Sequence, residues 1–175
     1  CAPNPPVGCI IALDGKVIGR GFHLQAGHAH AEVKALADAG HSVAGATVYV
    51  TLEPCAFAGR TPACAQTLID ARVARVVVAT QDPHPQVAGK GCQMLRHAGI
   101  EVVEFDLPAA RQMIAGFVSR ITRKRPRVVL KSASSLDGAV ALENGESQWV
   151  TGAAARRQVQ RLRAQSDAVI TSVGT

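Results

Sequence analysis

Aromatic side chains and charged side chains are both scarce in this 175-residue chain. Aromatic residues make up 3% of it and charged residues 18%, against a usual charged share of about 25%. Because hydrophobic residues make up 47%, the chain does not fit the low-hydrophobicity, high-charge composition of disordered proteins. The core must be built from Ala, Val, Ile and Leu, and few aromatic rings remain to stack on nucleic-acid bases.

Long hydrophobic runs and an even set of cysteines are also missing. Residues 7–13 are typical of the longest apolar runs and fall far short of the ~18 residues of a membrane span. No secretory signal opens the chain, so we expect no membrane partner. An odd number of cysteines argues against a disulfide framework and for a reducing compartment, the cytoplasm; the five are Cys1, Cys9, Cys55, Cys64 and Cys92.

The charge that is present is mostly positive, with a net charge of +6. Such a balance permits a nucleic-acid partner but equally suits a phosphorylated small substrate. Basic residues crowd the stretches 120–127 and 156–163. The first stretch contains Pro126 and is interpreted as a connector, with a nucleic-acid patch as the alternative.

Strand and helix patterns alternate along the first 121 residues. Asp14-Gly15 lies between two apolar runs, 7–13 and 16–22, and predicts a hairpin. The alternation that follows predicts an α/β layer fold with a mixed sheet. Further strands are expected at 47–52, 73–80 and 100–105, and helices at 30–39, 63–71, 92–98 and 108–121.

The last 49 residues hold fewer elements. The pattern predicts strands at 127–132 and 168–172 and a basic helix over 153–165. That is too little to close a layered domain. We therefore expect a first domain over 1–122, a linker at 123–126, and over 127–175 only the beginning of a second domain.

One imidazole and two thiols stand out as a metal-binding set. His30, Cys55 and Cys64 suit Zn²⁺, and three protein ligands leave a fourth position for water. Glu32, at the start of the same helix as His30, is a carboxylate able to move protons. The order H-x-E, then P-C with a second Cys, is the zinc deaminase signature, although eight residues rather than two separate the cysteines here. A closed structural zinc site is the alternative, with His23 and His28 as candidate fourth ligands; a buried histidine beside two ordinary cysteines is another.

Several stretches together resemble the bifunctional riboflavin-biosynthesis deaminase/reductases. The deaminase part of the resemblance lies in the segments 4–8, 30–32, 51–55, 59–64, 82–83 and 87–91. Lys131, the segments 135–138 and 145–149, and Thr151 resemble the start of the family's reductase domain. The long cysteine spacing with Gly-Arg-Thr-Pro inside it is typical of this branch of the deaminases.

The resemblance implies a cytidine-deaminase-like three-layer αβα fold with a mixed sheet, followed by the start of a dihydrofolate-reductase-like domain. It implies zinc-dependent hydrolytic deamination of 2,5-diamino-6-(5-phosphoribosylamino)pyrimidin-4-one, with Glu32 moving the protons. Asn4 and His23 match substrate-contacting positions, Arg60 matches the residue that meets the substrate phosphate, and His84 stands where the family usually has Asn.

For the second unit the resemblance implies NADPH-dependent reduction of the ribosyl group to ribityl. Ala133, Trp149 and Thr175 match cofactor-contacting positions, and Ser147 and Arg163 match substrate-contacting ones. We expect the chain as given not to carry out this reduction. The resemblance also leaves room for a homo-oligomer.

One departure from the family lies beside the first zinc cysteine. Ala56-Phe57 replaces the usual Ser-His and removes a polar partner for the substrate. This keeps open a zinc-stabilised binding module without activity. A nucleoside or tRNA-base deaminase is the other alternative, although it would favour the short cysteine spacing.

Overall fold

The computed structural model describes residues 1–57 and 62–171. It divides into two compact units, Cys1–Arg127 and Val128–Thr175, and each is described by itself.

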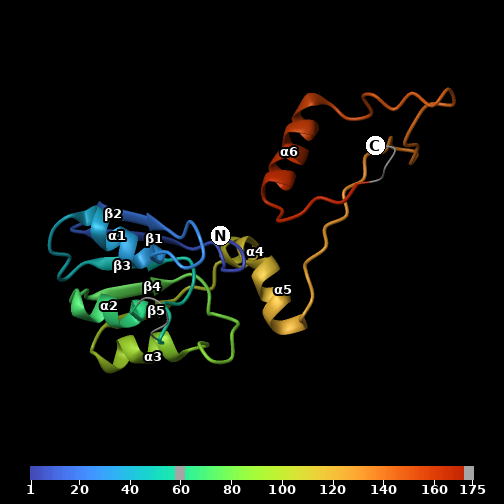
Figure 1. Cartoon of the computed structure of the whole chain (residues 1–175). Helices are drawn as coiled ribbons and strands as arrows, with labels where there is room; N and C mark the ends of the chain where they lie inside the picture. The colour runs from blue at the N-terminus through green and yellow to red at the C-terminus, as the bar shows by residue number, and fades with distance from the viewer. Residues whose placement is uncertain (58–61, 172–175) are drawn as a thin grey trace. The chain divides into compact units, whose positions relative to one another are not determined.

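A five-stranded mixed sheet forms the centre of the first unit (Figure 1). Its strands are β1 Gly8–Leu13, β2 Lys16–Phe22, β3 Thr47–Val50, β4 Arg75–Val78 and β5 Glu101–Glu104, in the order β2-β1-β3-β4-β5. β1 runs antiparallel to both β2 and β3, whereas β3, β4 and β5 run parallel. The predicted mixed sheet is confirmed, and so is the hairpin, because Asp14 and Gly15 have the positive φ values, 51° and 75°, of a two-residue turn.

Three helices share one hydrophobic core with one face of this sheet. They are α1 Ala31–Ala39, α2 Cys64–Asp70 and α3 Lys90–His97. The core is built from small and branched side chains, as the composition predicted: Cys9, Ile11, Val48, Val50, Val76 and Val78 from the strands, and Ala35, Leu68 and Leu95 from the helices.

A glycine in β2 lets α1 lie close to the sheet. A Cβ on Gly21 would stand 2.1 Å from the carbonyl oxygen of Ala31, closer than atoms can pack. The first turn of α1 is therefore pressed onto the hairpin, which fixes where His30 and Glu32 lie.

The opposite face of the sheet is only partly covered. Across the paired strands runs the row Arg20, Ile10, Tyr49, Val77 and Val103. Ile10 is 41% exposed and Tyr49 is 47% exposed. The helices α1, α2 and α3 therefore do not cover this face of the sheet.

The single helix predicted over 108–121 is two helices, α4 Pro108–Met113 and α5 Ala115–Arg123. The break falls at Ile114, which has φ −98° and ψ 10° and is 1% exposed. Burial of this side chain overrides the helical periodicity, and Gly116 in the next turn adds a weak helix former. Lys124 ends α5 in the left-handed conformation.

In the described part of the second unit, α6 Ala153–Ala164 confirms the predicted basic helix. The predicted strands are wrong for 127–132 and for 168–171, and residue 172 lies outside the described residues. A strand needs a neighbour to accept its backbone hydrogen bonds, and Val128 and Leu130, 83% and 92% exposed, have none among the described residues. None of the described helices is both long enough and apolar enough to cross a membrane.

Candidate metal centre and active site

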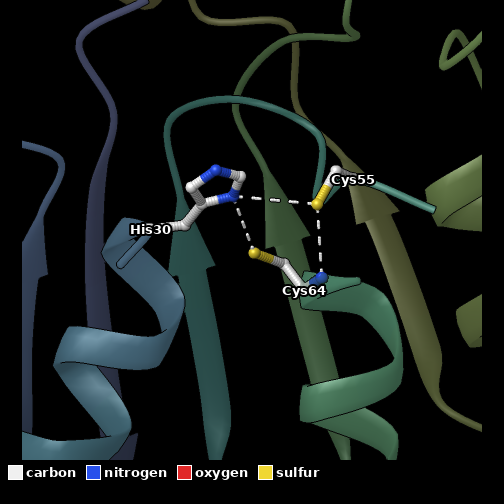
Figure 2. Close-up of side chains that lie close together, drawn as sticks. All are labelled: His30, Cys55 and Cys64. Atoms are coloured by element: carbon white, nitrogen blue, oxygen red, sulfur yellow. Dashed lines mark hydrogen bonds between the residues drawn. The ribbon is translucent and has the colours of Figure 1, made fainter. Parts of the chain in front are cut away.

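Three separate elements deliver the predicted metal ligands. His30 is the N-cap of α1, with extended backbone. Cys55 follows β3 after Glu53-Pro54, and Cys64 is the first residue of α2. Figure 2 shows the imidazole and the two sulfur atoms facing one another across these ends.

The donor atoms lie at spacings that fit zinc. The Nδ1 atom of His30 is 3.2 Å from the Sγ of Cys64 and 3.7 Å from the Sγ of Cys55. Tetrahedral coordination with Zn–S of about 2.3 Å and Zn–N of about 2.0 Å separates nitrogen from sulfur by roughly 3.5 Å. All three donor atoms lie within 4.8 Å of one another, and across 1–57 and 62–171 this is the one cluster of at least three His, Cys, Asp or Glu donors.

The surroundings of Cys55 favour its thiolate, the form that binds metal. Hydrogen bonds from Cys64 and from His30 lower the pKa of Cys55 to about 4 against the opposing effect of burial. One of these bonds comes from the backbone N–H of Cys64, with N 3.3 Å from the Cys55 sulfur. The hydrogen bond to Cys55, with burial, raises the pKa of Cys64.

Glu32 is a buried carboxylate outside the donor cluster. It lies in the first turn of α1 and is 3% exposed. Burial, as the largest cause, raises the pKa of its carboxyl above the usual range. A carboxyl whose pKa is raised in this way takes up a proton more readily than an exposed one, which suits it to proton transfer.

A cavity of about 560 Å³ is lined by Glu32 and by two of the metal donors, His30 and Cys55. Three predicted substrate residues, Asn4, His23 and His84, line the same cavity. Asn4 and His23 act as a pair, since the side-chain amide of Asn4 lies 3.1 Å from Nε2 of His23. Nδ1 of His23 lies 3.3 Å from the carbonyl oxygen of Ala29. Burial lowers the pKa of His23, so a neutral ring donates from Nδ1 and accepts at Nε2.

The cavity also contains residues that the sequence interpretation missed. Phe117 and Arg120 reach it from α5, although Arg120 had been assigned to the connector. Its guanidinium lies 2.9 Å from the carbonyl oxygen of Pro3, and no sequence pattern signalled that contact. Glu53 also lines the cavity, and its place directly before Pro54-Cys55 was an available signal.

The remaining predicted site residues lie in the segments that the structure does not describe or in the second unit. Arg60 and Thr175 lie outside the described residues. Within the second unit Ala133 is half-buried, whereas Ser147, Trp149 and Arg163 are exposed. The guanidinium of Arg156 lies over the Trp149 ring, 4.4 Å from its centroid.

Two family matches divide the chain. Residues 1–80 match the cytidine and deoxycytidylate deaminase zinc-binding region, and residues 126–175 match the RibD C-terminal domain. With the mixed sheet and the donor cluster, the first match confirms the predicted cytidine-deaminase-like fold and its zinc-binding character. The second agrees with the expected start of a reductase domain.

Relatives match nearly the whole chain. The riboflavin biosynthesis protein RibD of Escherichia coli K12 is 53% identical over 174 residues, 99% of this chain and 47% of that protein. The crystal structure of a diaminohydroxyphosphoribosylaminopyrimidine deaminase/5-amino-6-(5-phosphoribosylamino)uracil reductase from Thermotoga maritima is 41% identical with a TM-score of 0.84, covering 92% of this chain and 47% of that one. Acinetobacter baumannii RibD is 54% identical with a TM-score of 0.81, covering 95% and 47%.

The chain spans about half the length of the relatives it matches. The identity of 53% extends over 99% of the chain. The two family matches follow one another along it, the zinc-binding deaminase region first and the RibD C-terminal domain second. Over nearly its whole length the chain is therefore similar to about half of a bifunctional riboflavin-biosynthesis deaminase/reductase, with the zinc-binding deaminase region first and the match to the RibD C-terminal domain after it.

Proposed function

We propose that the first unit is a zinc-dependent hydrolytic deaminase of 2,5-diamino-6-(5-phosphoribosylamino)pyrimidin-4-one. The observation that carries this proposal is a three-donor cluster, His30, Cys55 and Cys64, with the buried non-ligand carboxylate of Glu32 lining the same cavity. The names of the relatives supply the substrate. In the proposed reaction, the amino group of the substrate is replaced by oxygen, one water is consumed and one ammonia is released.

His30, Cys55 and Cys64 would hold the zinc, whose chemistry when bound is to lower the pKa of a coordinated water to about 7. Glu32 would accept a proton from water at its carboxylate oxygen and pass protons to the ring and to the departing amine. Its burial excludes competing solvent and suits its carboxyl to both halves of that transfer.

We assign substrate binding to Asn4, His23 and His84 of the cavity lining and to Arg60, which lies between Cys55 and Cys64 in the sequence. Asn4 would use its amide, which His23 orients, and His84 would contact the pyrimidine from the 82–92 loop. Arg60 would pair with the phosphate, since a guanidinium binds phosphate bidentately. A small phosphorylated pyrimidine fits a cavity of about 560 Å³, and nucleic acid is not the proposed partner.

We propose the domain limits 1–122, 123–126 and 127–175, with the last segment as part of an NADPH-dependent reductase domain. Ala133, Trp149 and Thr175 would contact the cofactor, and Ser147 and Arg163 the substrate, in a complete domain. We propose a cytoplasmic location, because thiols stay reduced and available to a metal in a reducing compartment. Self-association stays a prediction from the resemblance, and sedimentation velocity tests it.

Glu32→Gln tests the deaminase proposal. The variant should keep about one zinc per chain, because Glu32 is not a ligand, and lose ammonia release by roughly 10²- to 10⁴-fold. Glu101→Gln, the same change at an exposed position of β5, is the control and should leave both unchanged. Undiminished turnover in Glu32→Gln would refute its role, and a zinc-free wild-type protein would refute the metal centre.

The substrate is tested by offering the wild-type protein the pyrimidine phosphate, cytidine, and adenosine in tRNA. We expect ammonia from the first alone. Release from cytidine or tRNA would favour the nucleoside or tRNA-base alternative. Zinc binding without any release would favour the inactive binding module that Ala56-Phe57 keeps open.

A further inference from the structure

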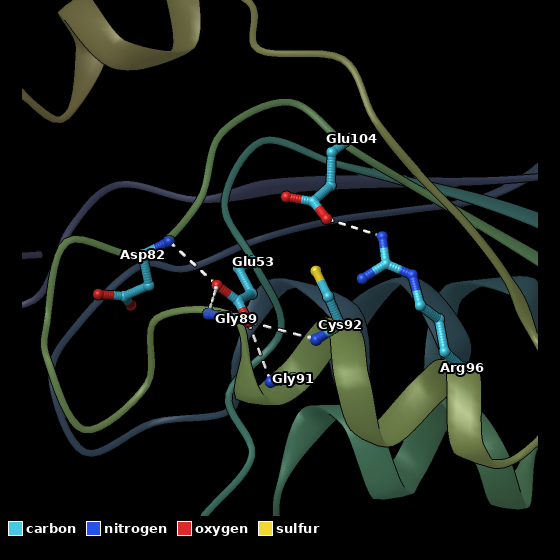
Figure 3. A network of polar contacts seen from close by, with 7 residues as sticks. All are labelled: Glu53, Asp82, Gly89, Gly91, Cys92, Arg96 and Glu104. Carbon is cyan, nitrogen blue, oxygen red and sulfur yellow. Dashed lines mark hydrogen bonds and ion pairs between the residues drawn. The ribbon is translucent and has the colours of Figure 1, made fainter.

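A second buried carboxylate, Glu53, stands two residues before the zinc ligand Cys55. It is 3% exposed, and its backbone N–H donates to the carbonyl oxygen of Thr80, 3.0 Å away, beyond the end of β4. Figure 3 shows its side chain at the centre of a polar network. The proposed chemistry does not use this group.

Both oxygens of the Glu53 carboxylate are occupied by backbone donors. Oε2 accepts from the N–H of Asp82 at 3.3 Å and of Gly89 at 2.9 Å. Oε1 accepts from the N–H of Gly91 at 2.9 Å and of Cys92 at 3.2 Å. One side chain thus binds both ends of the segment 82–92.

The far end of this segment is the start of α3. Gly91 and Cys92 lie in its first turn, where backbone N–H groups have no partner within the helix, and a carboxylate there satisfies them and complements the helix dipole. Gly91 packs directly against the metal-ligand segment, because a Cβ at this position would stand 1.8 Å from the carbonyl oxygen of Pro54.

The segment that Glu53 holds also forms part of the cavity wall, since Asp82, His84, Gln86 and Val87 line the cavity. Within it, Oδ1 of Asp82 accepts from the N–H of His84 at 2.8 Å. Nδ1 of His84 accepts from the N–H of Gln86 at 3.2 Å, which assigns the ring proton to Nε2 in the neutral form. A continuous chain of bonds runs from Glu53 to the imidazole of His84.

We propose that Glu53 is a positioning residue of this site: by holding both ends of the segment 82–92 against the Glu53-Pro54-Cys55 segment, it sets where Asp82 and His84 stand toward the substrate. The inference rests on the proposed deaminase function. It assigns Glu53 no contact with the reacting atoms. Its effect is to join the segment carrying a metal ligand to the segment facing the pyrimidine.

Glu53→Gln tests the inference with little change in size. A glutamine amide offers one acceptor oxygen and one donor NH₂, so in either orientation the NH₂ faces two backbone N–H groups. We expect amide hydrogen exchange at one end of the segment, either Asp82 and Gly89 or Gly91 and Cys92, to accelerate at least about tenfold. KM for the pyrimidine phosphate should rise roughly tenfold to hundredfold, with a smaller change in kcat and about one zinc retained per chain.

Glu104→Gln is the matched control. Glu104 is an exposed residue of β5, and its carboxylate pairs with the guanidinium of Arg96 across 2.7 Å at the surface (Figure 3). The same chemical change there should leave KM, kcat and exchange of the 82–92 amides unaltered. A role confined to stability would lower the unfolding midpoint of Glu53→Gln while KM, measured below that midpoint, stayed at the wild-type value, and this would overturn the inference.

If Glu53→Gln does not fold, two further measurements still test the inference. In the wild-type protein the amides of Gly89, Gly91 and Cys92 should exchange far more slowly than in an unstructured peptide; exchange at the peptide rate would overturn the inference without any variant. Glu53→Asp keeps the charge but is one methylene shorter, so it should raise KM, and an unchanged KM would count against the inference. If the wild type released no ammonia, the proposed function would fail while the exchange measurement still tested Glu53.

Discussion

The two units of the chain both contain apolar side chains, but these form a buried core in the first unit and not in the described part of the second. In the first unit the strand and helix side chains close on one another, and every buried residue of the described chain belongs to it. In the second unit none of the residues described through 171 is buried, although Val128, Leu130 and Ile170 are as apolar as the core residues of the first. Apolar side chains therefore fix a structure only where the chain supplies a second surface to bury them against.

The same contrast holds for chemistry. The donor cluster, the proton-moving carboxylate and the cavity come from residues up to Ile121. The predicted reductase residues of the second unit, Ser147, Trp149 and Arg163, stand exposed. A functional site needs side chains whose positions are fixed by packing, which the first unit provides.

The largest effect should come from removing one donor from the first unit. Cys64→Ala should reduce zinc from about one ion per chain to nearly none and abolish ammonia release, because two donors do not hold the ion. Cys92→Ala is the matched control, since Cys92 is an equally buried thiol, 0% exposed, on α3. If metal analysis found zinc lost from both variants, or from neither, the assignment of zinc to the donor cluster would be wrong.

This contrast also marks what the sequence could predict. The sequence predicted that His30, Cys55 and Cys64 would come together, because one imidazole and two thiols suit Zn²⁺, and the structure places them in one cluster. The hairpin was found because Asp14-Gly15 suits a turn with two positive φ values. These are local requirements, and local patterns carry them.

Other features could not be predicted because tertiary contacts decide them. The break at Ile114 depends on where that side chain is buried. The contact of Arg120 with Pro3 joins residues 117 positions apart. The strands expected at 127–132 and 168–172 had the right local pattern, but no partner strand stands beside the described part of either one.

A stability comparison sharpens the contrast with an intermediate effect. Leu68→Ala, in the core at 0% exposure, should lower the free energy of unfolding by about 2–5 kcal/mol. Leu162→Ala on α6, 38% exposed, should change it by no more than about 0.5 kcal/mol. Urea denaturation of both variants checks this, and equal losses would mean that α6 is packed as tightly as the first unit's core.

The smallest effect should follow from removing the second unit altogether. A chain ending at Arg127 keeps every buried residue, all three donors and the whole cavity lining. Its zinc content, its ammonia release and its urea midpoint should match those of the full chain within error. The released segment, 128–175, should show at most marginal helicity by circular dichroism, because α6 has 12 residues and isolated helices of about that length are marginal in water.

A shorter cut gives this last prediction its control. Ending the chain at Met113 removes α5 and with it Phe117, Arg120 and Ile121 from the cavity, while leaving the donors in place. That chain should still bind zinc but bind the pyrimidine phosphate more weakly, since one wall of the cavity is gone. If the cut at Arg127 weakened activity as much as the cut at Met113, the second unit would contribute to the deaminase, and the separation of the two regions would not hold.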